Sequence, residues 1–323
     1  MIKRNKNKIF NILLALGFIG LFAVYFSLNK DDFKVLLEIK AYYIFAIALL
    51  QICVIFVNAI FFIVIFKAFD LNIDTKEGLN TSIITAIGNY FTPFRGGLGI
   101  RAVYLKKKYG FSYSKFISTV AGNYVVVFLI NSLIALFCLG TLALQSKKID
   151  PILVLVFAGM FIILLLIVLF PIPSSKIPET KFGLLNKFIN KVKLVIEGWN
   201  VLAGKRSLII KLSILTLINA FIGIFLYYIE LKSIGTEVNL LYAIIYSSIS
   251  AISLLLSLTP GSLGIRESLL VLFQSSLMLG TSEILASSVV DRVIYFFVML
   301  ILLIITTLSG YVAKNKGIFK KEK

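Results

Sequence analysis

Two arginines follow breaks in otherwise apolar stretches, and they are the residues best suited to hold an anion. Arg101 ends the segment TPFRGGLGIR at residues 92–101, and Arg266 ends the segment TPGSLGIR at residues 259–266. Proline and glycine end helices, so each arginine is expected near the start of a new helix. A helix N-terminus offers free N–H groups to an anion, and glycine permits close approach to the backbone. The sequence therefore indicates either a phosphate site or an internal ion pair, since Glu267 adjoins Arg266.

Further polar side chains surround the two breaks. Asp291 and Arg292 are expected at the start of the last helix, where Asp291 either couples to protons or neutralises an arginine. Arg95, near the tip of the first break, either contacts substrate or extends to the membrane interface. Asn89 and Asn123 occupy corresponding places in the first half, where asparagine also commonly bonds a neighbouring helix. The candidate substrate-binding set is Arg101, Arg266, Glu267, Arg292, Asp291, Arg95, Pro93, Gly97, Pro260, Gly261, Gly264, Asn89 and Asn123.

The elements that must position these residues are transmembrane helices. The 323 residues are 59% hydrophobic, with a mean hydropathy of +0.98, whereas soluble domains are about 45–50% apolar. The 33 Lys and Arg against 15 Asp and Glu are expected to set topology and contact anionic lipid, not nucleic acid. The sequence has no histidine, and both cysteines lie inside apolar runs. We therefore expect no metal site, no cofactor and no disulfide framework.

Six uncharged stretches are long enough to cross a hydrocarbon core of about 30 Å. They cover residues 9–28, 41–66, 116–146, 151–175, 212–229 and 293–313. The broken regions 78–94 and 238–265 are either re-entrant hairpins or irregular single spans, because broken backbone survives in a membrane only where protein or water satisfies it. Residues 239–258 are long enough to span alone.

The distribution of basic residues distinguishes these two topologies. Two hairpins place 23 Lys and Arg inside and 6 outside, counting residues 230–237 as an outside loop, whereas two single crossings give 14 and 15. The positive-inside rule favours the hairpins, with both termini cytoplasmic. The expected fold is an all-α polytopic membrane protein with about 6 full spans plus 2 hairpins, or 8 segments in all.

The two broken regions form an internal repeat. Both contain Leu-Gly-Ile-Arg, and downstream Gly110-Phe111-Ser112 matches Gly280-Thr281-Ser282, each opening a long helix. Because one span lies between the copies, the second copy is inverted relative to the first. Inverted repeats with broken helices are the architecture of alternating-access transporters. The alternative is an old duplication without transport. The single membrane domain, 1–323, is thus divided into a first span 9–28, repeat 1 at 41–146, a linking span 151–175, a cytoplasmic amphipathic segment 181–206 and repeat 2 at 212–313.

The second break resembles the signature of the lysylphosphatidylglycerol synthase transmembrane-region family, also called flippase-like membrane proteins. The resemblance lies in residues 259–267 with Gly280 and Arg292, and residues 93–97 with Arg101 and Leu105 are similar to the other motif of that family. In fused members, this membrane unit is joined to a soluble aminoacyl-transferring domain and moves the aminoacylated lipid between leaflets. Without that domain, the resemblance does not imply lipid lysylation.

The first repeat departs from the family pattern at two places. Leu98 stands where the family often has an acidic residue, and Gly122-Asn123-Tyr124 stands where it often has a Glu-Arg pair in the following helix. The first half therefore carries fewer charges than the pattern. The resemblance implies roles for Arg101, Arg266, Glu267 and Arg292.

These observations predict a lipid translocase of the cell (plasma) membrane, not an enzyme. Its cargo would be an anionic phospholipid or a polyprenyl-phosphate lipid, held by arginines at the breaks. No nucleotide-binding motif is present, so direct ATP drive is not expected. One alternative is a partner that presents lipid to a glycosyltransferase or synthase; another is an intramembrane lipid-phosphate enzyme using Glu267 and Asp291 as acid and base. Homo-oligomerisation and association with a transferase both stay open.

Overall fold

The computed structural model describes residues 38–170 and 183–308, which form helices and connecting turns without any strand. The expected all-α class is confirmed for these residues. The expected first span at 9–28 and both termini lie outside them. In chain order the elements are α3 (Ala41–Lys67), α4 (Thr75–Phe91), η1 (Pro93–Arg95), α5 (Gly96–Tyr109), α6 (Tyr113–Leu144), α7 (Pro151–Leu169), α8 (Gly183–Ala203), α9 (Arg206–Ser233), α10 (Leu240–Ile252), η3 (Ser253–Leu256), η4 (Pro260–Ser262), α11 (Ile265–Leu272), α12 (Gln274–Leu277) and α13 (Thr281–Leu308).

Five of these helices are long and apolar enough to cross a membrane: α3, α6, α7, α9 and α13. They coincide with five of the six expected spans. The start of helix α7 is determined by its local sequence. Asp150 caps the first turn by accepting a hydrogen bond from the Ile152 N–H at 2.8 Å, and Pro151 occupies the first helical position. Only Leu153 and Phe157 of α7 are buried, as expected for a helix that faces lipid on most sides.

Two helix boundaries differ from the expectation. Helix α13 begins at Thr281, where the Gly280-Thr281-Ser282 match predicted a long helix, but Asp291 and Arg292 therefore lie well inside it and not at its start. Helix α9 continues to Ser233, so Glu230 belongs to a helix and is fully buried, although the sequence placed it in an outside loop. The expectation was wrong in both cases for one reason: helices were ended at charged residues, yet a charge is tolerated inside a membrane helix that faces protein.

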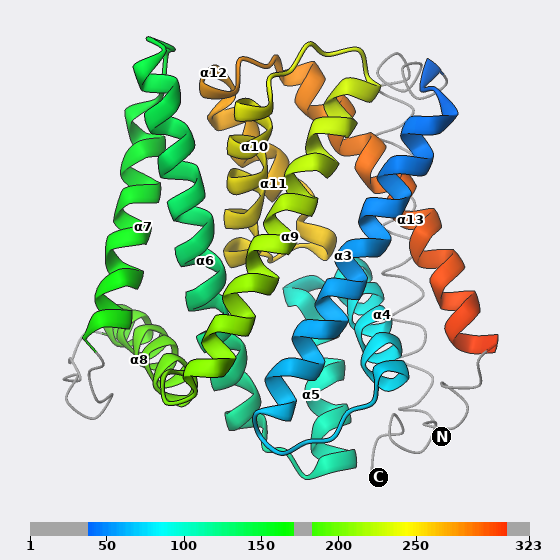
Figure 1. Ribbon diagram of the computed structural model, residues 1–323, viewed down its shortest axis with the longest axis vertical. Coiled ribbons are helices and arrows are strands. Elements are labelled where there is room, and N and C mark those ends of the chain that lie inside the picture. Colours follow the sequence, from blue (N-terminus) through cyan, green and yellow to red (C-terminus); the bar gives the residue numbers. More distant parts are fainter. Residues whose placement is uncertain (1–37, 171–182, 309–323) are drawn as a thin grey trace.

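Helices α4, α5 and α10 are shorter than the roughly 20 residues typical of a transmembrane helix. They contain 17, 14 and 13 residues, which at a rise of 1.5 Å per residue give lengths of about 26, 21 and 20 Å. The stretch 239–258, long enough to span, does not do so as one helix because α10 ends at Ile252 and a 3-10 turn follows. We call α4–η1–α5 the first hairpin and α10–η3–η4–α11 the second hairpin. Figure 1 shows the first in the lower half of the molecule and the second in the upper half.

The two breaks share one backbone conformation. Phe94 and Arg95, after Pro93, have φ values of 55° and 53°, and the aligned residues Gly261 and Ser262 have φ values of 56° and 55°. Left-handed backbone is costly for residues other than glycine, so its recurrence at aligned positions indicates the same turn in both breaks. The two breaks contact each other, and the tips of the hairpins therefore meet inside the protein.

Close helix crossings at glycine fix the lower half. A Cβ atom on Gly97 of α5 would lie 1.9 Å from the carbonyl oxygen of Thr85 on α4, and one on Gly122 of α6 would lie 2.2 Å from the carbonyl oxygen of Gly198 on α8. Only glycine permits backbones to approach so closely. Helix α8 covers most of the expected amphipathic segment, and its buried Trp199 packs in the core with α6.

Candidate functional site

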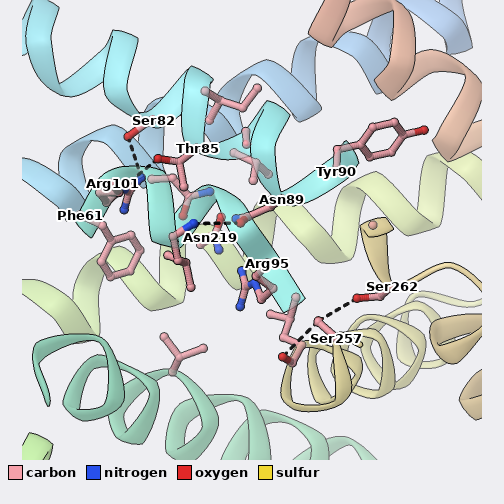
Figure 2. Close-up of a pocket in the computed structure, with 18 of the residues that line it drawn as sticks. Phe61, Ser82, Thr85, Asn89, Tyr90, Arg95, Arg101, Asn219, Ser257 and Ser262 are labelled. Carbon is pink, nitrogen blue, oxygen red and sulfur yellow. Dashed lines mark hydrogen bonds between the residues drawn. The ribbon is translucent and has the colours of Figure 1, made fainter. Parts of the chain in front are cut away.

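A polar cavity of about 430 Å³ lies where the two hairpins meet. Figure 2 shows Arg95, Arg101 and Asn89 on the side formed by the first hairpin, and Ser257 and Ser262 on the side formed by the second. Helices α3, α6, α9 and α13 complete the wall. Eight of the thirteen candidate residues line this cavity: Arg101, Arg266, Arg292, Asp291, Arg95, Asn89, Asn123 and Gly261.

The other five candidates shape the hairpins without lining the cavity. Pro93 and Pro260 begin the two breaks. Gly97 packs against α4, so it serves helix packing and not the approach of a headgroup. Gly264, with φ of 80°, precedes α11, and its N–H donates to Glu267 Oε2 at 2.8 Å.

Where the second hairpin packs against α13, Arg266 of α11 and Arg292 of α13 are both neutralised by carboxylates. Arg266 Nη1 lies 2.6 Å from Asp291 Oδ2, and Arg292 Nη2 lies 2.6 Å from Glu267 Oε1. Arg266 Nε also lies 3.5 Å from Glu267 Oε1, and Gln51 on α3 donates to Asp291 Oδ1 at 2.9 Å. Of the two interpretations left open for Arg266, the structure places it in an internal ion pair.

These ion pairs also hold the tip of the second hairpin against α13. Arg292 Nη1 donates to the carbonyl oxygen of Gly261 at 3.4 Å. Tyr90 on α4 donates to the carbonyl oxygen of Arg292 at 3.2 Å. The position of the tip relative to α4 and α13 therefore depends on the Glu267–Arg292 pair.

In the first hairpin the aligned arginine has no carboxylate partner. Arg101 Nε donates to Thr85 Oγ1 at 3.1 Å and Nη2 to Ser82 Oγ at 3.3 Å, and the guanidinium lies 4.7 Å from the centre of the Phe62 ring. Figure 2 shows the two hydrogen bonds from Arg101 to Thr85 and Ser82. Arg95 donates to the hydroxyl of Tyr124 and lies over its ring. Within the described ranges neither arginine pairs with an acid, so the first half of the cavity carries two uncompensated positive charges.

The departures from the family pattern explain this imbalance. Leu98 lines the cavity, and its N–H donates to Asn89 Oδ1 at 3.2 Å. Gly122 packs against α8, Asn123 lines the cavity, and Tyr124 bonds Arg95. No carboxylate stands at these positions to pair with Arg95 or Arg101.

Sequence reasoning missed several polar residues of the cavity. Asn219 on α9 lines it, and its Oδ1, like that of Asn123, is buried with no hydrogen-bond partner among the described atoms. Ser82 and Thr85, which orient Arg101, were also missed. Their spacing with Asn89, at i, i+3 and i+7, was a usable signal because it places three polar side chains on one face of a helix. Asn219 had no such signal, since it is a single amide in an apolar run.

An apolar pocket of about 580 Å³ adjoins the polar cavity. The two share Leu98, Phe116, Val120 and Tyr124 as walls, and α5, α6, α7 and α8 form the rest of the apolar pocket together with Leu255. The polar and apolar spaces together match an amphipathic ligand. No cluster of three or more Asp, Glu, Cys or His side chains suited to a metal ion occurs in the described part of the chain.

Comparison with known protein families finds one that matches most of the chain. A family model described as the lysylphosphatidylglycerol synthase TM region matches residues 10–302, which include both hairpins. No curated protein and no solved structure matches the chain. With the five apolar helices, the match indicates a membrane protein with a role related to membrane lipids. The chain belongs to the family of the lysylphosphatidylglycerol synthase TM region.

Proposed function

We propose that the protein is a translocase that moves a lipid with an anionic phosphate headgroup between the leaflets of the plasma membrane. The observation that carries this proposal is the pair Arg95 and Arg101, which line the cavity without an acidic partner in the described residues. An arginine inside a membrane costs about 2.5–3.5 kcal/mol on insertion scales. A phosphate would supply the missing counter-charge through charge-assisted hydrogen bonds.

The cavity supports a specific placement of such a lipid. Ser82 and Thr85 orient the Arg101 guanidinium, and the unpartnered oxygens of Asn123 and Asn219 would accept hydrogen bonds from headgroup hydroxyls. The adjoining apolar pocket would receive one hydrocarbon chain, because it shares walls with the polar cavity. The proposed cargo is an anionic phospholipid or a polyprenyl-phosphate lipid.

The arrangement of the hairpins supports alternating access. Their breaks have matching backbone angles, their tips touch, and they occupy opposite halves of the molecule (Figure 1). Broken helices that meet near the middle of the membrane form the binding sites of inverted-repeat transporters. The proposal includes cytoplasmic termini and a first hairpin that opens to the cytoplasm, because the excess of Lys and Arg lies on that side.

A reconstituted transport assay tests the proposal. Liposomes containing the purified protein and fluorescent phosphatidylglycerol are treated with a membrane-impermeant quencher, and the rate of lipid crossing is followed. We expect Arg101→Gln to slow crossing at least tenfold, and Arg206→Gln, at an exposed position outside the cavity, to leave it unchanged. Equal rates for wild type and Arg101→Gln would reject the role of this arginine.

The same preparation distinguishes the other functions considered. Lipid mass spectrometry after incubation detects any product, and a new lipid species would favour an intramembrane enzyme. A wild-type protein that moves no lipid but co-purifies stably with a transferase would instead favour lipid presentation to that partner. Both outcomes contradict translocation by the protein alone.

A further inference from the structure

Glu230 is a carboxylic acid inside the protein that the proposed lipid site does not use. It lies on α9 with an exposed fraction of 0%, and neither of its carboxyl oxygens has a hydrogen-bond partner among the described atoms. It does not line the polar cavity. Burial of an ionised carboxylate without a donor is strongly unfavourable, and an ionisable group inside a membrane protein commonly marks a proton pathway.

The charged and titratable neighbours of Glu230 come from four helices. They are Asp291 on α13, Arg266 on α11, Tyr246 on α10 and Tyr227 on α9 itself. Asp291 and Arg266 act on the Glu230 carboxyl group electrostatically, with opposite signs. Helix α3 contributes the uncharged Gln51, which donates to Asp291 at 2.9 Å.

The charges around Glu230 already balance without it. Arg266 pairs with Asp291 and Arg292 pairs with Glu267. An ionised Glu230 would add an uncompensated negative charge near Asp291, whereas a protonated Glu230 adds none. The burial of Glu230 and this charge balance therefore favour a neutral acid.

Glu230 lies on α9 between the end of this helix and Tyr227, which lines the polar cavity. It is three residues from the end of α9 at Ser233, or about 5 Å along the helix axis, and this end of α9 lies at the top of the molecule in Figure 1. Its neighbours Asp291 and Arg266 line the cavity. Tyr227, about one helical turn before Glu230, lines the cavity as well, so a proton bound at Glu230 is close to the ligand space.

We propose that Glu230 binds the proton that couples lipid movement to a proton gradient. One proton binds the Glu230 carboxylate from one side of the membrane and is released to the other, and no other bond is made or broken. When Glu230 is deprotonated, its carboxylate competes with Asp291 for Arg266. This changes the pairing that holds the second hairpin to α13. The inference rests on the proposed translocase function.

Transport under an imposed pH gradient tests the coupling. In the liposome assay we expect the wild-type rate to change at least threefold with a gradient, and the Glu230→Gln rate to be the same with and without it. Glu230→Asp should retain the dependence. Glu197→Gln, at an exposed carboxylate on α8, should behave as wild type. The coupling is rejected if the wild type moves lipid without responding to the gradient, or if the Glu230→Gln variant still responds. Neither result contradicts the proposed translocase function. A wild-type protein that moves no lipid at all rejects both the coupling and the translocase function.

Infrared spectroscopy tests the proton on Glu230 without any transport. A protonated carboxyl group has a carbonyl band distinct from that of a carboxylate. We expect the wild type at pH 7 to show this band, Glu230→Gln to lose it and Glu197→Gln to retain it. A wild type without the band, or a Glu230→Gln variant with an unchanged band, overturns the assignment of the proton site.

Discussion

Arg101 and Arg266 occupy the same position in the two Leu-Gly-Ile-Arg segments but have opposite electrostatic surroundings. Arg101 bonds two neutral hydroxyls, and Arg266 bonds a carboxylate at 2.6 Å. Replacement by methionine should therefore have opposite effects. Arg101→Met removes an unpaired cation that lines the cavity and should preserve or raise stability while it abolishes lipid transport. Arg266→Met leaves Asp291 buried without its partner and should lower the free energy of unfolding by about 3–5 kcal/mol.

Thermal unfolding of the purified variants in detergent measures this contrast. The charge-neutral double variant Arg266→Met, Asp291→Leu is the control, and it should recover most of the loss because it leaves no unpaired charge. If Arg101→Met is as unstable as Arg266→Met, Arg101 has a structural role and the phosphate site is in doubt.

The sequence identified these arginines but not their partners. Arginine after a Pro–Gly break is conspicuous in an apolar chain, so both could be found from local pattern alone. Their partners come from other helices, as in the pair of Arg266 with Asp291. The two identical Leu-Gly-Ile-Arg segments therefore do not show that one arginine has an acidic partner and the other does not. Glu230 was missed because a charge was taken as the end of a span, and its burial depends on the packing of α9 against other helices, among them α3, α10 and α13.

At the scale of elements, the first hairpin depends on a glycine contact between α4 and α5. A Cβ on Gly97 would lie 1.9 Å from a backbone oxygen of α4, which cannot move without displacing the helix. Gly97→Ala should therefore destabilise the protein by about 1–3 kcal/mol, as overpacking does. Gly140→Ala on α6 is a matched control because nothing lies within 4 Å of its Cβ position. The packing role of Gly97 would be contradicted if Gly97→Ala and Gly140→Ala lower the unfolding temperature equally, or if Gly97→Ala does not lower it.

The apolar pocket between α5, α6, α7 and α8 gives a second prediction at this scale. Gly99 lines the pocket, and nothing lies within 4 Å of its Cβ position, so phenylalanine there would fill space without a clash. We expect Gly99→Phe to keep wild-type stability and slow transport of long-chain lipids at least fivefold, with a smaller effect on short-chain lipids. Gly140→Phe serves as the control. Transport that is independent of chain length would show that the pocket does not hold the hydrocarbon chain.

The sequence predicted long helices better than short ones. Five spans were predictable because an uncharged run of about 20 residues has few alternatives to a helix across the membrane. The breaks were predictable because proline and glycine interrupt helices wherever they occur. The repeat match at Gly280-Thr281-Ser282 also predicted a helix opening at the observed start of α13. The uncharged run alone did not, since Asp291 and Arg292 interrupt it, and only their tertiary partners make them compatible with a helix interior.

At the scale of the whole molecule, the two halves share a backbone pattern but differ in charge. Each half supplies a hairpin whose break has the same left-handed pair of residues. The upper hairpin is neutralised by Asp291 and Glu267, whereas the lower one presents Arg95 and Arg101 to the cavity without an acid in the described chain. A ligand bound to this cavity is therefore held mainly by the lower half, and movement of the upper tip would alter access to it.

Access to the hairpins from the two sides of the membrane is the prediction that decides this architecture. The open end of the first hairpin lies at the bottom of Figure 1 and that of the second at the top, and their helices are shorter than a typical membrane span of about 20 residues. After Cys53 and Cys138 are replaced by alanine, Lys106→Cys and Ser282→Cys place single thiols at exposed positions at these two ends. With a membrane-impermeant thiol reagent, we expect Ser282→Cys to label in intact cells and Lys106→Cys only in inverted vesicles. Labelling of both from one face would mean that the hairpins enter from the same side. The repeats would then not be inverted, the cavity would open to one side only, and lipid presentation to a partner would explain the two unpaired arginines better than translocation.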